Sequence, residues 1–295
     1  AFNMLAGQVN QPIIRTAQLW QDFQQFRISM RRLGDILTAK PEVERGTTPE
    51  NLPALQGDIE FRNVTFRYNP EGAEILRNVS FKIDAGQTIG IVGPSGSGKT
   101  TLTKLIQKMF TPSSGSVMVD GFDIALLNPS WLRRQVGTVL QENVLFNATV
   151  AENIAMSNPA MPMNDIIAAS QISGAHDFIT KLPMAYDTFL DERGGNLSGG
   201  QRQKIAIART LAAKPRILIL DEPTAALDYD SERIFQRNLG LITQNVTTVI
   251  IAHRLSTIRH ADVILVMEDG ELKDQGTHET LLQSSELYAR LNAYG

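Results

Sequence analysis

The chain has 295 residues, of which 42% are hydrophobic and 20% are charged, a composition that provides enough apolar side chains for a sizeable globular core. Its formal net charge of −3 argues against a nucleic-acid partner, because surfaces that bind phosphate backbones usually carry a basic excess. The absence of cysteine excludes a disulfide framework and a thiolate metal site.

An amphipathic helix is predicted near the N-terminus and should end before Pro41. Its apolar residues recur at steps of three or four: Ile13, Ala17, Trp20, Phe23, Phe26, Met30, Leu33 and Leu37. Residues 40–58 contain three prolines without periodicity, which indicates a linker or an extended segment. The helix either packs on its own domain or extends from an upstream one. Because the chain starts at Ala1 inside this helix, we expect it to be a piece of a longer protein.

A mixed α/β domain is predicted from Gly57 to Gly295. Residues 58–68 alternate apolar and polar with a slip at Asn63, and residues 80–93 indicate a strand, a turn and a strand. Short apolar runs at 217–220, 246–252 and 262–267, separated by helical patterns, predict a largely parallel sheet. The region from about 143 to 213 is helical and interrupts this alternation, so we expect an inserted α-helical subdomain. No apolar run reaches the roughly 18 residues of a membrane span.

A phosphate-binding loop is predicted at residues 93–100, where GPSGSGKT fits the pattern G-x-x-x-x-G-K-[ST] between a strand and a helix. Successive backbone N–H groups and the helix N-terminus cradle phosphate oxygens in such a loop. Lys99 would reach the β and γ phosphates of ATP, and the hydroxyl of Thr100 would bind Mg²⁺. The alternative is a plain glycine-rich turn. The predicted ATP-binding residues here are Gly93, Pro94, Ser95, Gly96, Ser97, Gly98, Lys99, Thr100 and Thr101.

A second part of the site is predicted in the stretch RILILDEP, where two acids follow four apolar residues. Asp221 would hold Mg²⁺ through water, and Glu222 would polarise an attacking water as general base. Two solvated acids at a strand end are the ordinary alternative, but the phosphate loop makes the catalytic interpretation stronger.

Five further motifs resemble the nucleotide-binding domain of ATP-binding-cassette (ABC) proteins over about residues 57–295. They are Tyr68 after VTFR, Gln141 after VGTVL, LSGGQ at 197–201, AALD at 225–228 and His253 after VIIA. The resemblance implies a P-loop NTPase fold, with a RecA-like parallel-sheet core, an antiparallel β subdomain and an inserted α-helical subdomain.

The resemblance also implies roles for these residues. Tyr68 would stack on adenine, Gln141 would contact Mg²⁺ or the lytic water, and His253 would bond the γ-phosphate and help to position Glu222. Asp228 would cross the interface of a dimer. Each has a structural alternative: a half-buried aromatic for Tyr68, a strand-end cap for Gln141 and a core-edge histidine for His253.

The LSGGQ motif implies an ATP-dependent head-to-tail homodimer, in which each motif contacts the ATP that the other copy holds. The residues concerned are Ser198, Gly199, Gly200 and Gln201. We predict that the helix behind them runs from Gln201 to Ala213 and that its N-terminus is left bare for an anion.

The N-terminal stretch is similar to the cytoplasmic end of the last membrane helix in ABC exporters, particularly the haemolysin-type exporters of bacterial type I secretion. GAHDFI, WLRRQVGTVLQ and IIAHRLSTI agree with this, whereas Pro223 and Ala226 depart from the usual pattern. The resemblance implies an ATP-hydrolysing motor domain that is itself soluble and works at the cytoplasmic face of the inner membrane. A transmembrane domain in the same chain, a periplasmic adaptor and an outer-membrane channel would be its partners.

Other members of the same family remain alternatives. An exporter of peptides, lipids or drugs shares parts of these motifs. A soluble ATPase that acts on DNA or ribosomes is disfavoured by the single cassette and the acidic charge, and an importer subunit by the N-terminal helix. A degenerate, non-hydrolysing cassette is disfavoured by the presence of Lys99, Glu222 and His253.

Overall fold

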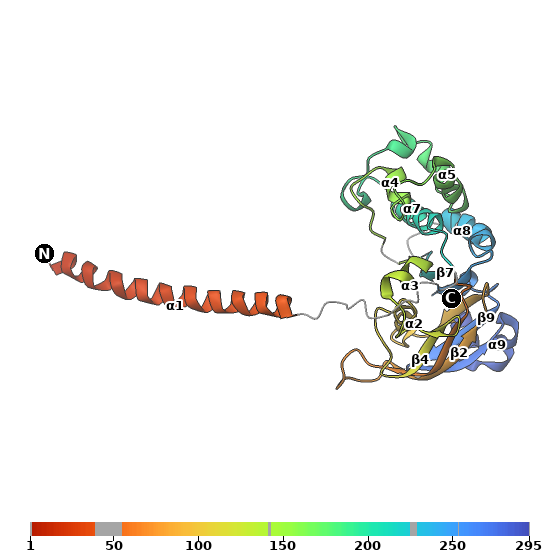
Figure 1. The fold of residues 1–295 in the computed structure, drawn as a ribbon, viewed down its shortest axis with the longest axis horizontal. Coiled ribbons are helices and arrows are strands. Elements are labelled where there is room, and N and C mark those ends of the chain that lie inside the picture. Colours follow the sequence, from red (N-terminus) through yellow and green to blue (C-terminus); the bar gives the residue numbers. More distant parts are fainter. Residues whose placement is uncertain (1, 39–54, 141–142, 225–228, 253, 295) are drawn as a thin grey trace. The chain divides into compact units, whose positions relative to one another are not determined.

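Two units, Ala1–Glu44 and Arg45–Gly295, make up the chain (Figure 1). The computed structural model describes residues 2–38, 55–140, 143–224, 229–252 and 254–294. Three of the predicted site residues, Gln141, Asp228 and His253, lie outside these ranges.

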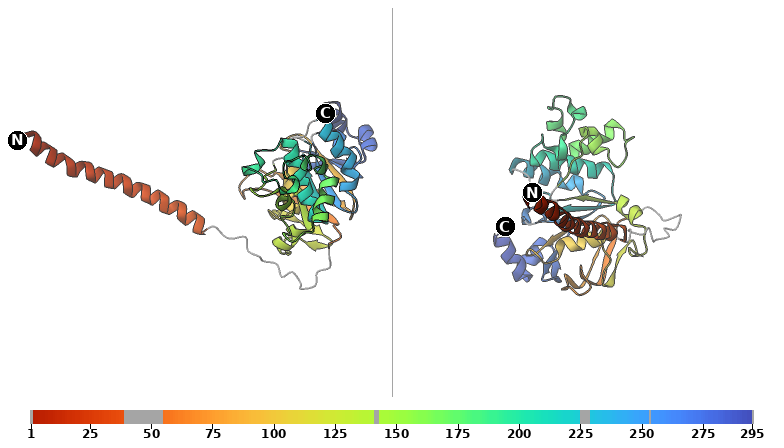
Figure 2. Two further views of the ribbon diagram at one scale, coloured as in Figure 1. Left: turned by 90° about the horizontal axis from the view of Figure 1, so that it is seen from above. Right: turned by 90° about the vertical axis from the view of Figure 1, so that its left-hand side faces the viewer.

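The N-terminal unit contains one long helix, α1 (Phe2–Thr38), which Figure 2 shows as a continuous rod. The helix includes Pro12 and ends before Pro41, as predicted. Its described apolar side chains are exposed, including Trp20 at 63% and Phe26 at 61%. Within the described part of the chain, no helix combines the length and apolarity needed to cross a membrane.

The larger sheet of the second unit has the strand order β10-β9-β3-β8-β7-β6 and confirms the predicted parallel core. All neighbouring strands are parallel except the edge pair β9 and β10. The three short apolar runs form β7, β8 and β9. The strands are β3 (Thr88–Val92), β6 (Val136–Val139), β7 (Ile217–Asp221), β8 (Thr247–Ile251), β9 (Val263–Glu268) and β10 (Glu271–Gly276).

A smaller antiparallel sheet has the order β2-β1-β4-β5. Its strands are β1 (Ile59–Phe66), β2 (Leu76–Ile83), β4 (Ser114–Val119) and β5 (Phe122–Asp123). The predicted slip is an irregularity in the β1–β2 pairing between Phe61 and Val64, and Asn63 there has a φ of 48°. β2 and β3 follow each other in sequence but belong to different sheets, so the chain changes sheet at the intervening turn.

The apolar core is divided by the parallel sheet. One cluster lies between the two sheets and joins Phe61 and Ile83 to Ile91 and Leu102. The other covers the opposite face of the parallel sheet, where Leu220 and Ile250 pack with the C-terminal helices. Helices of this part are α2 (Lys99–Ile106), α3 (Pro129–Gln135), α8 (Tyr229–Ile242), η3 (Leu255–Thr257), α9 (His278–Ser284) and α10 (Glu286–Tyr294).

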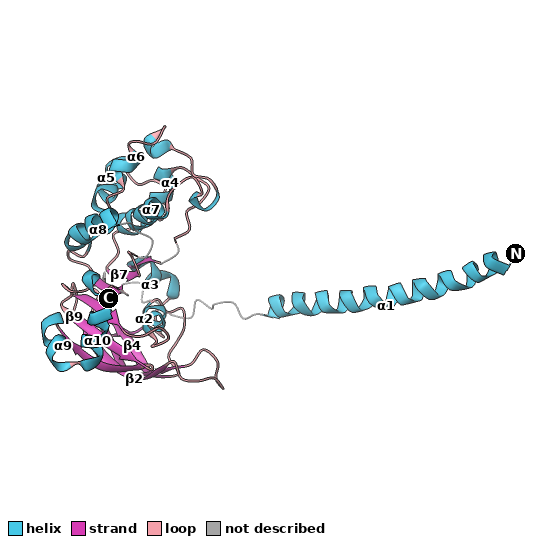
Figure 3. Cartoon of the chain, turned by 180° about the vertical axis from the view of Figure 1, so that it is seen from behind, coloured by secondary structure: helices cyan, strands magenta, loops and turns pink. Residues whose placement is uncertain are grey.

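A helical subdomain is inserted between β6 and β7 and gathers at one end of the second unit (Figure 3). A third apolar cluster, from Leu145 to Ala212, forms its own core. Its elements are α4 (Val150–Ile154), α5 (Met163–Ile172), α6 (His176–Ile179), η1 (Ala185–Asp187), η2 (Glu192–Gly194) and α7 (Gly199–Ala212). The predicted fold class is thus confirmed in all three of its parts.

Leu220→Ala should lower the free energy of unfolding by about 2–5 kcal/mol, because Leu220 is fully buried in a central strand and the truncation leaves a cavity. Urea unfolding followed by circular dichroism measures the loss. The matched control is Leu126→Ala, at a side chain that is 73% exposed. Equal losses in the two variants would contradict the central place of β7 in the core.

Candidate functional site

The loop between β3 and α2 is shaped by three glycines with left-handed backbone. Their φ angles are 150° at Gly93, 83° at Gly96 and 97° at Gly98. A Cβ on Gly93 would lie 2.0 Å from the carbonyl oxygen of Met267, and one on Gly98 would lie 2.7 Å from Leu76. Gly96 differs, because no atom lies within 4 Å of a Cβ built there. The loop is therefore packed against β9 and β2 on two sides and open at Gly96.

Lys99, the first residue of α2, has its ammonium beneath this loop. Its Nζ donates to the carbonyl oxygens of Gly93 at 2.8 Å and Pro94 at 2.9 Å, and the residue is 7% exposed. Burial lowers the pKa of Lys99, while the negative charges of Glu222 and Asp221 oppose that shift. The structure thus brings the predicted lysine and both predicted acids together.

The polar groups around Lys99 fit a phosphate with its magnesium ion. The hydroxyl of Ser97 is buried without a hydrogen-bond partner among the described residues, and Thr100 is exposed on the first turn of α2. The described residues contain no cluster of three or more acids or histidines that could hold a metal by itself. This donor set suits Mg²⁺, which usually takes one or two protein oxygens and completes its shell with phosphate and water.

Asp221 and Glu222 occupy the carboxyl end of β7, next to β8. Asp221 pairs with Ile251, and the N–H of Glu222 donates to the carbonyl of Ile251 at 2.9 Å. Glu222 has a φ of 50°, a conformation that destabilises a non-glycine residue by about 1 kcal/mol. A strained backbone at a half-buried acid beside Lys99 is typical of a functional position.

Tyr68 lies beside the start of α2, two residues beyond the end of β1 rather than inside the strand. Its hydroxyl lies 3.1 Å from Thr101 Oγ1, and Phe66 and Phe110 contact its ring edge to face. The ammonium of Lys104 lies 5.5 Å from the ring centroid. The ring is 42% exposed, so part of it can meet a ligand next to the loop.

The ABC transporter family matches this sequence over residues 76–225, which span the phosphate loop, LSGGQ and the two acids. The chain belongs to the ABC transporter family. It is therefore an ATP-binding domain with the ATPase activity of that family.

Curated relatives extend the similarity to almost the whole chain. The leukotoxin export ATP-binding protein LtxB of Aggregatibacter actinomycetemcomitans is 56% identical over 293 residues, 99% of this chain and 41% of that protein. The leukotoxin translocation ATP-binding protein LktB of Mannheimia haemolytica is 55% identical over the same shares. This chain thus spans less than half the length of these relatives. A bacterial Atm1-family ABC exporter, solved with ATP bound, has a TM-score of 0.83 and 38% identity, covering 97% of this chain and 50% of that one.

The LSGGQ motif of this ABC domain is capped rather than bare, which corrects the prediction. Ser198 Oγ accepts the N–H of Gln201 at 3.2 Å, and Gln201 Oε1 accepts the N–H of Ser198 at 2.9 Å. This capping box lets α7 begin at Gly199 instead of Gln201 and end at Ala212. The N–H groups of Gly199 and Gly200 stay without an intrahelical acceptor, because they lie in the first turn.

No described contact joins the LSGGQ residues to the phosphate loop of the same ABC domain. α7 packs in the helical subdomain, where Ile205 and Ala208 belong to its core. The loop at Gly93 packs instead against β9 in the sheet core.

Two polar residues of α7, one buried and one half-buried, were not among the predicted site residues. Gln203 is 1% exposed, and its amide donates to the carbonyl of Pro223. Arg209 donates to Val144 O at 3.0 Å, Asn153 O at 2.9 Å and Asn153 Oδ1 at 2.7 Å, and burial lowers its pKa. The sequence gives little signal for either residue, because α7 also carries other polar side chains, including Arg202 and Lys204.

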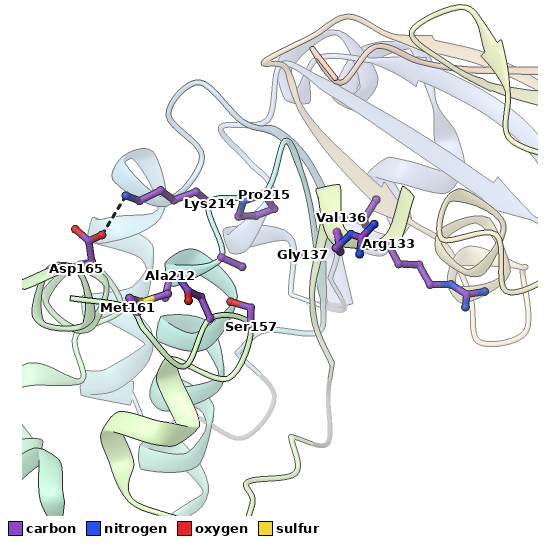
Figure 4. Close-up of a pocket in the computed structure, with 12 residues that line it drawn as sticks. Arg133, Val136, Gly137, Ser157, Met161, Asp165, Ala212, Lys214 and Pro215 are labelled. Carbon is purple, nitrogen blue, oxygen red and sulfur yellow. Dashed lines mark hydrogen bonds and ion pairs between the residues drawn. The ribbon is translucent and has the colours of Figure 1, made fainter. Parts of the chain in front are cut away.

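A groove of about 540 Å³ lies between the core and the helical subdomain, and Figure 4 shows its lining. Arg133 and Gly137 line it from the core side, and Met161 and Ala212 from the subdomain. Lys214 Nζ lies 3.4 Å from Asp165 Oδ2 at its edge. None of the predicted nucleotide-binding residues of this ABC domain lines the groove.

Glu222→Gln should lower the pKa of Lys99 further, because it removes one of the two negative charges that favour the ammonium form. Lys99 then reacts with acetic anhydride at lower pH than in the unchanged chain. Pulsed acetylation at several pH values, read by peptide mass spectrometry, measures the midpoint.

Lys82 is the internal reference for this experiment. Asp84 and Asp58 raise its pKa, and neither is changed, so its midpoint should stay constant. If the Lys99 midpoint stayed constant too, the proposed influence of Glu222 would be wrong.

Proposed function

We propose that this chain is the ATP-hydrolysing motor domain of an exporter that secretes a protein by the type I route. The observation that carries the proposal is the 56% identity to a leukotoxin export ATP-binding protein over 99% of the chain, α1 included. The Atm1-family exporter, at 38% identity, is less similar to this chain than the two leukotoxin proteins are.

The proposal assigns the phosphate loop and Lys99 to the β and γ phosphates of ATP, and Tyr68 to the adenine. Thr100 and Asp221 would hold Mg²⁺, together with Gln141 from outside the described residues. When bound, Mg²⁺ neutralises charge on the transferred phosphoryl group. Glu222 orients and polarises the attacking water as general base, and His253 helps to place it.

Two copies are proposed to face each other head to tail, as in the family. The N–H groups of Gly199 and Gly200 then meet the ATP of the other copy, with Ser198 and Gln201 beside them. Asp228 crosses the interface. Closure of the pair excludes water, so each site works only when the partner supplies its LSGGQ motif.

The remaining partners are proposed from the relatives and from α1. The leukotoxin proteins are more than twice as long as this chain, which leaves room for a transmembrane domain in the same polypeptide. The exposed apolar stripe of α1 suits a helix whose packing surface lies in that domain. A periplasmic adaptor and an outer-membrane channel complete the proposed system, with this domain at the cytoplasmic face of a bacterial inner membrane.

Glu222→Gln should reduce ATP turnover at least 100-fold and leave ATP binding intact, because it removes the general base and no phosphate ligand. Phosphate release and fluorescent-nucleotide titration measure the two quantities. Glu71→Gln, at an exposed turn, is the control and should retain turnover. Near-normal turnover in the Glu222→Gln variant would exclude Glu222 as the general base.

The unchanged chain and its Glu222→Gln variant also provide a test of protein export. The unchanged chain, exchanged for the matching part of LtxB, should support leukotoxin secretion, whereas the Glu222→Gln exchange should not. An exchange that folds, hydrolyses ATP and exports no toxin would contradict the protein-export proposal.

Ser198→Ala should reduce turnover far more than it reduces ATP affinity of the single chain, because Ser198 serves the ATP of the other copy. The change also removes a helix cap, which by itself destabilises the fold by about 1 kcal/mol. Thr149→Ala removes a matched capping box at α4 and controls for this loss. Equal effects of the two variants on turnover, or equal losses of affinity and turnover at Ser198, would contradict the head-to-tail arrangement.

A further inference from the structure

Gln203 connects the helix behind LSGGQ to the backbone that carries Glu222. Its Nε2 donates to the carbonyl of Pro223, the residue directly after Glu222. Gln203 comes from the helical subdomain, whereas Pro223 follows a central strand of the sheet. This hydrogen bond therefore joins the helical subdomain to the sheet core at the residue next to Glu222.

The surroundings of Gln203 argue against a purely structural role. The side chain is 1% exposed, and its Oε1 has no hydrogen-bond partner among the described residues. The next buried residues of α7, Ile205 to Ala208, are apolar. A buried acceptor without a partner destabilises a protein, so an apolar side chain of equal length would serve packing at least as well.

Glu222 is held from two directions. Its own N–H bonds to Ile251 of β8, which fixes the left-handed backbone on the strand side. Pro223 has no N–H and a restricted φ, so its carbonyl direction is set by the turn and by the Gln203 amide. A displacement of α7 relative to β7 therefore has to displace Pro223 or break this bond.

We propose that Gln203 is a positioning residue that orients Glu222 according to the position of the LSGGQ helix. The inference rests on the proposed role of Glu222 as general base. In the proposed dimer, hydrolysis of the ATP held by a chain's own phosphate loop would then depend on the position of α7. The LSGGQ motif at the start of α7 contacts the ATP held by the other copy.

Gln203→Met, which keeps the length and removes both polar atoms, should lower kcat at least tenfold. The KM for ATP should change by less than about twofold, because the phosphate loop lies in other elements. The thermal midpoint should stay within about 3 °C, since the loss of one hydrogen bond is offset by removal of the unpaired acceptor. An unchanged kcat would overturn the inference.

Gln203→Glu gives a signature that a packing defect does not produce. Burial raises the pKa of a carboxyl at this position, and only its protonated form can donate to the carbonyl of Pro223. The ratio of its kcat to that of the unchanged chain should therefore rise severalfold as the pH falls from about 8 to about 6. A ratio that is constant over this range would overturn the inference.

Gln107→Glu is the matched control. Gln107 is also buried, at 8% exposure, and its Nε2 donates to the Thr103 carbonyl at 3.1 Å, at the far end of α2 from Lys99. The same chemical change there should give a pH-independent kcat ratio. Normal turnover in Gln203→Met beside an inactive Glu222→Gln overturns this inference alone, whereas normal turnover in Glu222→Gln overturns it together with the proposed role of Glu222.

Discussion

The parallel pairing of β3, β8 and β7 is the constraint on which the site depends. Because these strands run in one direction, the phosphate loop, Ala252 and the pair Asp221–Glu222 all lie at the carboxyl ends of strands, at one edge of the sheet. The strands are buried almost throughout, so their register is fixed by packing on both faces. The hydrophobic pattern of β3, β7 and β8 thus determines where Lys99, Asp221 and Glu222 are placed.

Lys99, which is buried, and Arg209, which is half-buried, illustrate different uses of a positive charge in this fold. Lys99 bonds two carbonyls of its own loop, and the negative charges of two acids favour its ammonium form. Arg209 bonds carbonyl and amide oxygens of the segment from Val144 to Asn153, and none of its described hydrogen bonds goes to a carboxylate. We propose a ligand-binding role for Lys99, whereas Arg209 links a loop of the helical subdomain to α7.

Sequence reasoning succeeded where a signal is local. The loop after β3, the acids at the end of β7 and the slip at Asn63 are each encoded within a few residues, and each lies in the predicted structural context, while the binding and catalytic roles stay predictions. The predicted start of α7 at Gln201 was wrong, although Ser198 and Gln201 have the spacing of a capping box. The glycines between them were interpreted as a bare terminus, and the cap outweighed their low helix propensity.

The links between distant segments could not be predicted from the sequence. Gln203 and Pro223 are separated by a helix end, a turn and a strand, and only the tertiary packing of α7 over β7 brings them together. The same holds for Arg209. Its acceptors lie in the segment from Val144 to Asn153, and nothing in the sequence of that segment predicts a hydrogen bond to Arg209. Roles assigned through the family resemblance to Gln141, Asp228 and His253 remain predictions, since these residues lie outside the described ranges.

The distribution of tryptophan gives the chain two independent optical reporters. It has two tryptophans, Trp20 on the exposed stripe of α1 and Trp131 packed partly against the core next to β6. Red-shifted emission from Trp20 in water should move to shorter wavelength when a partner covers α1, whereas Trp131 senses the nucleotide-binding unit. Variants that keep only one tryptophan can therefore follow attachment of the N-terminal helix and the state of the ATPase core separately, without an added label.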